Sequence, residues 1–232
     1  MKKLILKQET FKDFLSFQRS KDPLKDLDAV SEDVRNIISN VKLKGDEALL
    51  KYTKKFDNLN LLNINELIFN KDDMKQAYSQ LDKKKKESLS YLKERIKRFH
   101  ESIPLEGWYL KDEIFEKYGQ VSRPIKRVGL YAPGGNAIYP SSVLMTSVLA
   151  KIAGVKEILL SFPPSRSDLK ELMLASAYIG GVDEVVCLGG AQSIAAMTYG
   201  TDSIKKVDKI FGPGNQYVAE AKRQVYGIVG ID

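Results

Sequence analysis

Three polar residues in the second half of the sequence stand where short apolar segments give way to glycine-containing loops. Tyr131 ends one such segment, Gln192 follows a Gly-Gly pair, and Asn215 follows a Gly-Pro-Gly turn. Backbone amides at the start of a helix bind anions such as pyrophosphate, and glycine lets the backbone approach a ligand closely. Tyr131 could stack on a base or ribose or be a core aromatic, and Asn215 could be a simple helix cap. We therefore take Tyr131, Gln192 and Asn215 as candidate residues for binding a nucleotide or a small polar molecule.

Side chains that commonly carry out catalysis are scarce in this sequence. It contains one histidine, His100, which ends a basic helical pattern, and one cysteine, Cys187, which lies within an apolar run. We interpret His100 as structural or solvent-facing and Cys187 as a small buried hydrophobe. Zinc sites need several His, Cys or carboxylate ligands, and we find no such set and no Ser-His-Asp arrangement. The residues alone therefore nominate no catalytic and no metal-binding residue.

The elements that must position the candidate residues alternate regularly from about residue 126 onward. Apolar segments are predicted to be strands at 127–131, 157–162, 184–188 and 206–211, with helices at 141–153, 168–179, 192–199 and 215–226. Strands this apolar are buried on both faces, which is typical of a parallel sheet covered by helices. Ligands bind at the carboxyl ends of the strands in such sheets. The sequence therefore predicts an α/β fold with a parallel-sheet, Rossmann-like domain over 126–232, although neither a G-x-G-x-x-G nor a P-loop signature is present.

The first half follows a different, mostly helical pattern. Apolar residues recur at helical spacing between 31 and 56, with a break expected at Gly45, and again over 70–81 and 89–99. A short strand is expected at 66–69 and a hairpin between 108 and 121. We therefore predict two domains. Residues 1–125 would form the mostly helical part of an incomplete first α/β domain, and residues 126–232 would form the second domain.

Composition and charge limit the kinds of function that the protein could have. The chain has 232 residues, 43% hydrophobic and 29% charged, which is ordinary for a globular protein. Its net charge of +7 raises the possibility of nucleic-acid binding, but the run Lys83-Lys84-Lys85-Lys86 lacks interleaved aromatics and is better explained as a solvated helix face. No stretch approaches the roughly 18 apolar residues of a membrane span. We expect a cytoplasmic protein that binds neither nucleic acid nor membrane.

Several motifs, in this order along the chain, resemble histidinol dehydrogenase. The motifs are Val128-Gly129-Leu130-Tyr131-Ala132-Pro133-Gly134-Gly135, Tyr139-Pro140-Ser141-Ser142-Val143-Leu144-Met145, Gly189-Gly190-Ala191-Gln192-Ser193-Ile194-Ala195-Ala196, Gly212-Pro213-Gly214-Asn215 and Gly230-Ile231-Asp232. The first half resembles the family more loosely, through Gly45-Asp46-Glu47-Ala48-Leu49 and Phe99-His100-Glu101. The resemblance implies a zinc-dependent, intertwined homodimeric enzyme of histidine biosynthesis. Such an enzyme oxidises L-histidinol to L-histidine through the aldehyde with two NAD⁺.

The resemblance also assigns roles to particular positions. It implies that Tyr131, Gln192 and Asn215 contact NAD. The family's catalytic Glu-His pair and its zinc ligands belong to segments beyond the end of this sequence, so we expect the chain alone to be inactive. The alternative hypothesis is a stand-alone nucleotide- or metabolite-binding module without catalysis. A third hypothesis, a basic nucleic-acid or interaction protein, is supported only by the net charge.

Overall fold

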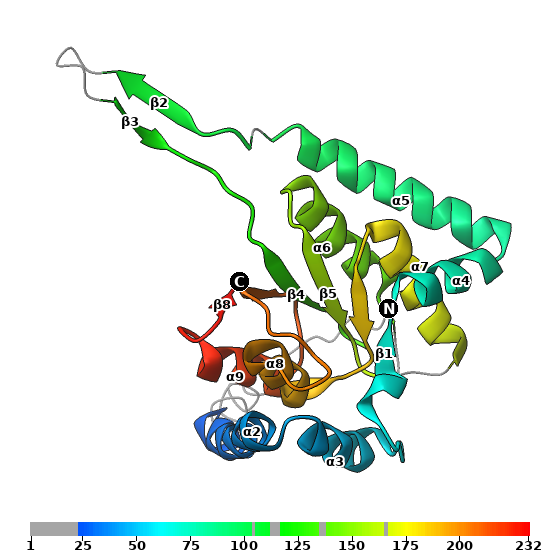
Figure 1. The fold of residues 1–232 in the computed structure, drawn as a ribbon, viewed down its shortest axis with the longest axis vertical. Helices are drawn as coiled ribbons and strands as arrows, with labels where there is room; N and C mark the ends of the chain where they lie inside the picture. The colour runs from blue at the N-terminus through cyan, green and yellow to red at the C-terminus, as the bar shows by residue number, and fades with distance from the viewer. Residues whose placement is uncertain (1–22, 104, 112–116, 135–137, 165–166) are drawn as a thin grey trace, which may run out of the picture.

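The computed structural model describes residues 23–103, 105–111, 117–134, 138–164 and 167–232. It confirms the predicted α/β class (Figure 1). One mixed sheet has the strand order β1-β6-β5-β4-β7-β8. Strands β4 to β8 are parallel to one another, and within this sheet only β1, from the first half, runs antiparallel, against β6.

The sheet is built mainly from the βα units that the sequence predicted. Its strands are β1 (Ile68–Phe69), β4 (Arg127–Tyr131), β5 (Glu157–Ser161), β6 (Glu184–Val186), β7 (Lys209–Phe211) and β8 (Gly230–Ile231). From β4 the chain adds β5 and β6 on one side and then returns to add β7 and β8 on the other. The carboxyl ends of β4 and β7 therefore flank a switch point of the topology, which is where open α/β sheets bind ligands.

The middle of the sheet forms the core of the molecule. All five residues of β4 are buried, as are the last four residues of β5. Gly129, at the centre of β4, lies against α8, and a Cβ added there would come within 2.6 Å of the sulfur of Met197. The absence of a side chain at Gly129 thus lets the Met197 side chain of α8 pack directly on the strand.

Helices of the second half cover both faces of the sheet. They are α6 (Pro140–Ile152), α7 (Ser167–Gly180), α8 (Gly190–Tyr199) and α9 (Gln216–Val225). Contacts between α6 and α7 and between α8 and α9 define two layers on either side of the strands. No helix within the described ranges is both long and apolar enough to span a membrane.

Helices of the first half pack onto these layers from outside. They are α2 (Pro23–Lys44), α3 (Asp46–Asp57), α4 (Lys71–Gln80) and α5 (Lys83–Glu101), with the short 3₁₀ helix η1 (Ile64–Leu67) before β1. The predicted break at Gly45 is confirmed, with a φ of 51°. Helix α2 contacts α8 and α9, whereas α4 packs on α7 and α5 on α6. The proposed domain division at residue 126 remains a prediction, and elements from both sides of it share one sheet.

A hairpin extends away from the body of the molecule (Figure 1). Strands β2 (Trp108–Lys111) and β3 (Lys117–Gln120) pair antiparallel, and every residue of both strands is exposed. The predicted hairpin is thus confirmed. Its exposed aromatic residues, Trp108, Tyr109 and Tyr118, make it an apolar surface without a covering partner among the described residues.

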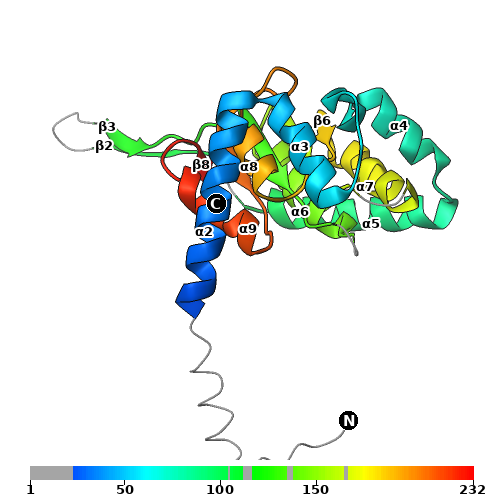
Figure 2. The same ribbon diagram turned by 90° about the horizontal axis from the view of Figure 1, so that it is seen from below.

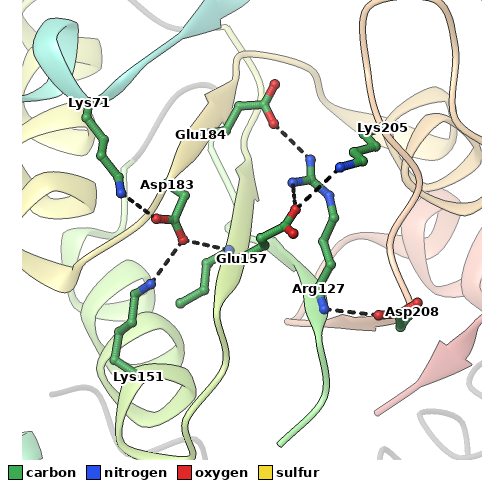
Figure 3. A network of polar contacts seen from close by, with 9 residues as sticks. Lys71, Arg127, Lys151, Glu157, Asp183, Glu184, Lys205 and Asp208 are labelled. Atoms are coloured by element: carbon green, nitrogen blue, oxygen red, sulfur yellow. Dashed lines mark hydrogen bonds and ion pairs between the residues drawn. The ribbon is translucent and has the colours of Figure 1, made fainter.

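Ion pairs join the amino-terminal ends of three neighbouring strands (Figure 3). Arg127, at the start of β4, donates to Glu157 of β5 at 3.0 Å and to Glu184 of β6 at 2.8 Å. Next to them, Asp183 accepts hydrogen bonds from the Lys151 side chain at 3.0 Å and from the Ile158 amide at 2.9 Å. These contacts anchor the edge of the sheet opposite the loops that carry the candidate residues.

Candidate functional site

A pocket of about 600 Å³ lies at the carboxyl ends of the strands. One wall consists of the loops after β4, β5, β6 and β7, and the other consists of α2 and α3 (Figure 2 shows these two helices beside α8 and α9). All three residues predicted from the sequence, Tyr131, Gln192 and Asn215, line this pocket. The structure therefore brings together side chains that lie up to about 80 residues apart in the chain.

Tyr131 connects the end of β4 to the start of α8. The residue is buried, and its hydroxyl oxygen accepts a hydrogen bond from the Gly190 amide at 3.1 Å. Burial raises the pKa of the Tyr131 hydroxyl, against the effect of the Gly190 amide, and the nearby Asp57 carboxylate raises it further. The phenol therefore keeps its proton, which it can donate to a ligand.

The start of α8 offers backbone amides to the pocket. Its N-cap residue is Gly189, which supplies no side-chain cap, and Gly190 has a φ of 65°. Tight packing holds this turn in place, because a Cβ on Gly189 would come within 2.8 Å of the Pro163 ring. Gln192 follows on the first turn with its side chain buried. An uncapped helix start with a neighbouring carboxamide is suited to binding a phosphate group.

Asn215 caps α9. Its Oδ1 atom accepts hydrogen bonds from the Tyr217 and Val218 amides, both at 3.1 Å. Asn215 is therefore the N-cap of α9, and its role in ligand binding stays a prediction. Both bonds use the oxygen, so the Nδ2 amide is the group that this side chain could offer to a ligand.

Helix α3 contributes a wall that the sequence analysis missed. Tyr52 and Phe56 stack in parallel with ring centroids 5.6 Å apart, and both line the pocket. Asp57 ends the helix and also lines the pocket. Burial raises the pKa of its carboxyl from 3.8 to about 6. These residues occupy an ordinary amphipathic pattern, and only the tertiary fold shows that α3 faces the strand ends.

The remaining chemically active side chains lie elsewhere. Cys187 is buried and desolvation raises the pKa of its thiol to about 12, in agreement with a packing role. His100 lies near the end of α5, with its ring edge against Phe99, and does not line the pocket. Within the described ranges no three His, Cys, Asp or Glu side chains gather as a metal site requires. Gly135, of the loop after β4, lies outside the described residues.

Comparisons with known proteins agree with the resemblance in the sequence. The family model described as "Histidinol dehydrogenase" matches residues 20–232. Histidinol dehydrogenase from Chromobacterium violaceum is 43% identical over 97% of this chain, which covers 50% of that relative. The relative from Neisseria meningitidis serogroup A is 41% identical over 100% of this chain, which covers 54% of its length.

The fold agrees as well. A crystal structure of histidinol dehydrogenase from Elizabethkingia anophelis superposes with a TM-score of 0.79 at 32% identity, over 90% of this chain and 51% of that one. The chain thus spans about half the length of the relatives it matches. Motif order, family match and fold all lead to one conclusion: the chain belongs to the histidinol dehydrogenase family.

Proposed function

We propose that this chain supplies the NAD-binding pocket of a histidinol dehydrogenase. The observation that carries the proposal is the convergence of Tyr131, Gln192 and Asn215 on one pocket at the switch point of the sheet. Volumes of about 300–1,000 Å³ are usual for pockets that bind small molecules and cofactors. In this proposal the whole protein oxidises L-histidinol to L-histidine through the aldehyde.

The side chains and backbone amides that line the pocket support a dinucleotide as its ligand. The uncapped start of α8 suits the pyrophosphate, and Gln192 and Tyr131 stand beside it as polar partners. Phe56 and Tyr217 are partly exposed aromatic residues on the rim, and their faces suit a purine base. Bound NAD would accept hydride from the substrate. The residues of this chain would bind and orient the cofactor.

The described part of the chain offers no set of side chains that could form a zinc site. Zinc sites use three or four His, Cys or carboxylate ligands, and no such group forms among the residues that the structure describes. We expect the chain alone, mixed with NAD⁺, Zn²⁺ and L-histidinol, to form no NADH when absorbance is followed at the nicotinamide band.

Calorimetric titration with NAD⁺ tests the binding proposal. We expect the Gln192→Ala and Asn215→Ala variants each to bind NAD⁺ about tenfold more weakly, the effect of losing one good hydrogen bond to the ligand. Glu94→Ala, on the exposed side of α5, is the matched control and should bind like the parent chain. Far-UV circular dichroism checks that each variant is folded. Unchanged affinity in both pocket variants would refute the assignment.

We also propose that the protein is a cytoplasmic homodimer. The exposed hairpin supports this, because Trp108, Tyr109 and Tyr118 leave apolar surface uncovered. Light scattering should detect dimers or larger species as the concentration rises. Replacing Tyr109 and Tyr118 with serine should return the chain to a monomer, and a parent chain that stays monomeric at high concentration would contradict the proposal.

A further inference from the structure

Two side chains from outside the turn after β7 hold that turn in place. Gly212 follows the last residue of β7 and opens the turn that leads to Asn215 at the start of α9. The Gly212 amide donates a hydrogen bond to Oδ2 of Asp232 at 2.8 Å, and its carbonyl accepts one from the Lys222 ammonium at 2.9 Å. The same ammonium forms an ion pair with Oδ1 of Asp232. Both polar backbone groups of Gly212 are therefore bound by one ion pair, Asp232 with Lys222, which we call the Gly212 clamp.

The sheet explains why these side chains reach the turn. Strand β8 pairs parallel with β7, and Asp232 directly follows β8, so it lies beside the residue that follows β7. The Asp232 amide continues this pairing with a hydrogen bond to the Ile210 carbonyl at 3.3 Å. Lys222 comes from the last turn of α9, and its side chain is only 13% exposed. The clamp thus joins β7, β8 and α9 at one point.

The charges of the clamp strengthen its contacts with the turn. Burial disfavours the charged form of Asp232, but the hydrogen bonds from Lys222 and Gly212 outweigh it and hold the pKa of the carboxyl below its usual value. The carboxylate is therefore ionised at neutral pH, and hydrogen bonds to charged groups are stronger than those between neutral groups. Desolvation offsets much of the attraction in a partly buried ion pair, so we take the geometry that this pair imposes as its main effect.

The turn that the clamp holds is part of the pocket wall. Gly212 has a φ of 120°, and a Cβ there would come within 2.0 Å of the Tyr131 carbonyl oxygen, so the turn packs directly on the end of β4. Three residues later, Asn215 caps α9 and lines the pocket. Asp232 and Lys222 are not among the described residues that line this pocket. A displaced turn would therefore move Asn215 relative to a ligand that the clamp itself does not contact.

We propose that Asp232 and Lys222 are positioning residues, which place Asn215 for ligand binding by fixing both polar groups of Gly212. The inference rests on the proposed function, because it assumes that NAD occupies the pocket. It goes beyond that function because it makes the affinity of the pocket depend on an ion pair outside its wall.

Calorimetric titration of NAD⁺ into the Asp232→Asn and Lys222→Met variants tests the proposal. Asparagine has one side-chain oxygen and cannot replace both oxygens of the carboxylate, and methionine approximates the length of lysine without its donors. A misplacement of about 1 Å can cost up to about a hundredfold, and we expect each variant to bind NAD⁺ about tenfold more weakly.

Lys151→Met is the matched control for these variants. It breaks the ion pair of another partly buried lysine with an aspartate, Asp183, at the opposite edge of the sheet. This variant can lose stability as the clamp variants do, but it should bind NAD⁺ like the parent chain. Far-UV circular dichroism checks that each variant is folded, and either clamp variant alone suffices for the test.

A double variant separates positioning from a general structural role. If the clamp acts through Asn215, adding Asp232→Asn to Asn215→Ala should weaken NAD⁺ binding by less than about threefold beyond Asn215→Ala alone. Losses that multiply to about a hundredfold would mean that the clamp acts independently of Asn215 and would overturn the inference. An Asn215→Ala variant that binds NAD⁺ like the parent chain would overturn it as well.

The outcomes distinguish this inference from the proposed function. If the parent chain binds NAD⁺ and the clamp variants bind it equally well, the positioning role is wrong while the pocket assignment stands. If Lys151→Met loses as much affinity as the clamp variants, the loss reflects stability and the inference falls. A parent chain that does not bind NAD⁺ would contradict both proposals.

Discussion

The Oδ2 atom of Asp57 is buried and makes no hydrogen bond to any residue that the structure describes. Removing the charge of this carboxylate is therefore expected to stabilise the protein. Asp57→Asn keeps the size of the side chain and its hydrogen-bonding oxygen but cannot ionise. The pKa of Asp57 is raised from 3.8 to about 6 by burial, so the folded state holds the proton more tightly than the unfolded state does. Above about pH 6 the ionised carboxylate therefore destabilises the fold, and below about pH 4 both states are protonated and the cost disappears.

The size of the effect follows from that shift. Each pKa unit corresponds to about 1.4 kcal/mol, so a shift of about two units gives an upper value of about 3 kcal/mol. Asp57 is only partly buried, and solvent reduces the penalty. We expect Asp57→Asn to raise the free energy of unfolding by about 1.5 kcal/mol at pH 7.5, with the gain shrinking towards zero between pH 6 and pH 4.

Urea denaturation of the two proteins across this pH range measures the difference. Asp33→Asn is the matched control, because it removes one negative charge from an exposed position lining the same pocket. It should change the free energy of unfolding by less than about 0.5 kcal/mol at every pH. A stability gain for Asp57→Asn that is absent at pH 7.5, or that stays constant down to pH 4, would refute the reasoning.

Two further predictions concern polar contacts outside the pocket. Arg127→Met should lower the free energy of unfolding by about 2–3 kcal/mol in urea titrations, because it leaves the partly exposed carboxylates of Glu157 and Glu184 without their shared partner; a loss below about 1 kcal/mol would contradict this. The Arg223 hydrogen bonds lower the pKa of Glu220 from 4.5 to about 2. Glu220→Gln should thus be about 1–2 kcal/mol less stable at pH 7, and its deficit should close as the pH falls from about 4.5 towards 2. A pH-independent deficit would argue against the ion pair as its cause.

The alternation of apolar segments and glycine-rich turns was enough to predict the sheet and one wall of the pocket. Strands β4 and β5 and the positions of Tyr131, Gln192 and Asn215 follow from local patterns that each βα unit repeats. Four strands are shorter than predicted: β1 begins at Ile68, β5 ends at Ser161, β6 ends at Val186 and β7 begins at Lys209. Beyond the end of β6 the chain continues with the buried apolar residues Cys187 and Leu188, so hydrophobicity alone overestimates strand length there.

The other wall of the pocket depended on contacts distant in sequence. Phe56 and Asp57 lie at the end of an amphipathic helix whose pattern reveals which face is buried but not which element covers it. Strand β1 likewise joins β6, which lies more than 100 residues later, in an antiparallel pairing that no local signal specifies. Sequence periodicity is a local property, whereas the partner of a helix or an edge strand is set by the whole fold.

The most direct test of the account is a crystal structure of the chain grown with saturating NAD⁺. We expect the pyrophosphate at the start of α8, within hydrogen-bonding distance of the amides near Gln192. A dinucleotide bound elsewhere on the molecule, or a pocket that stays without it at saturation, would contradict the central claim that this pocket is the cofactor site.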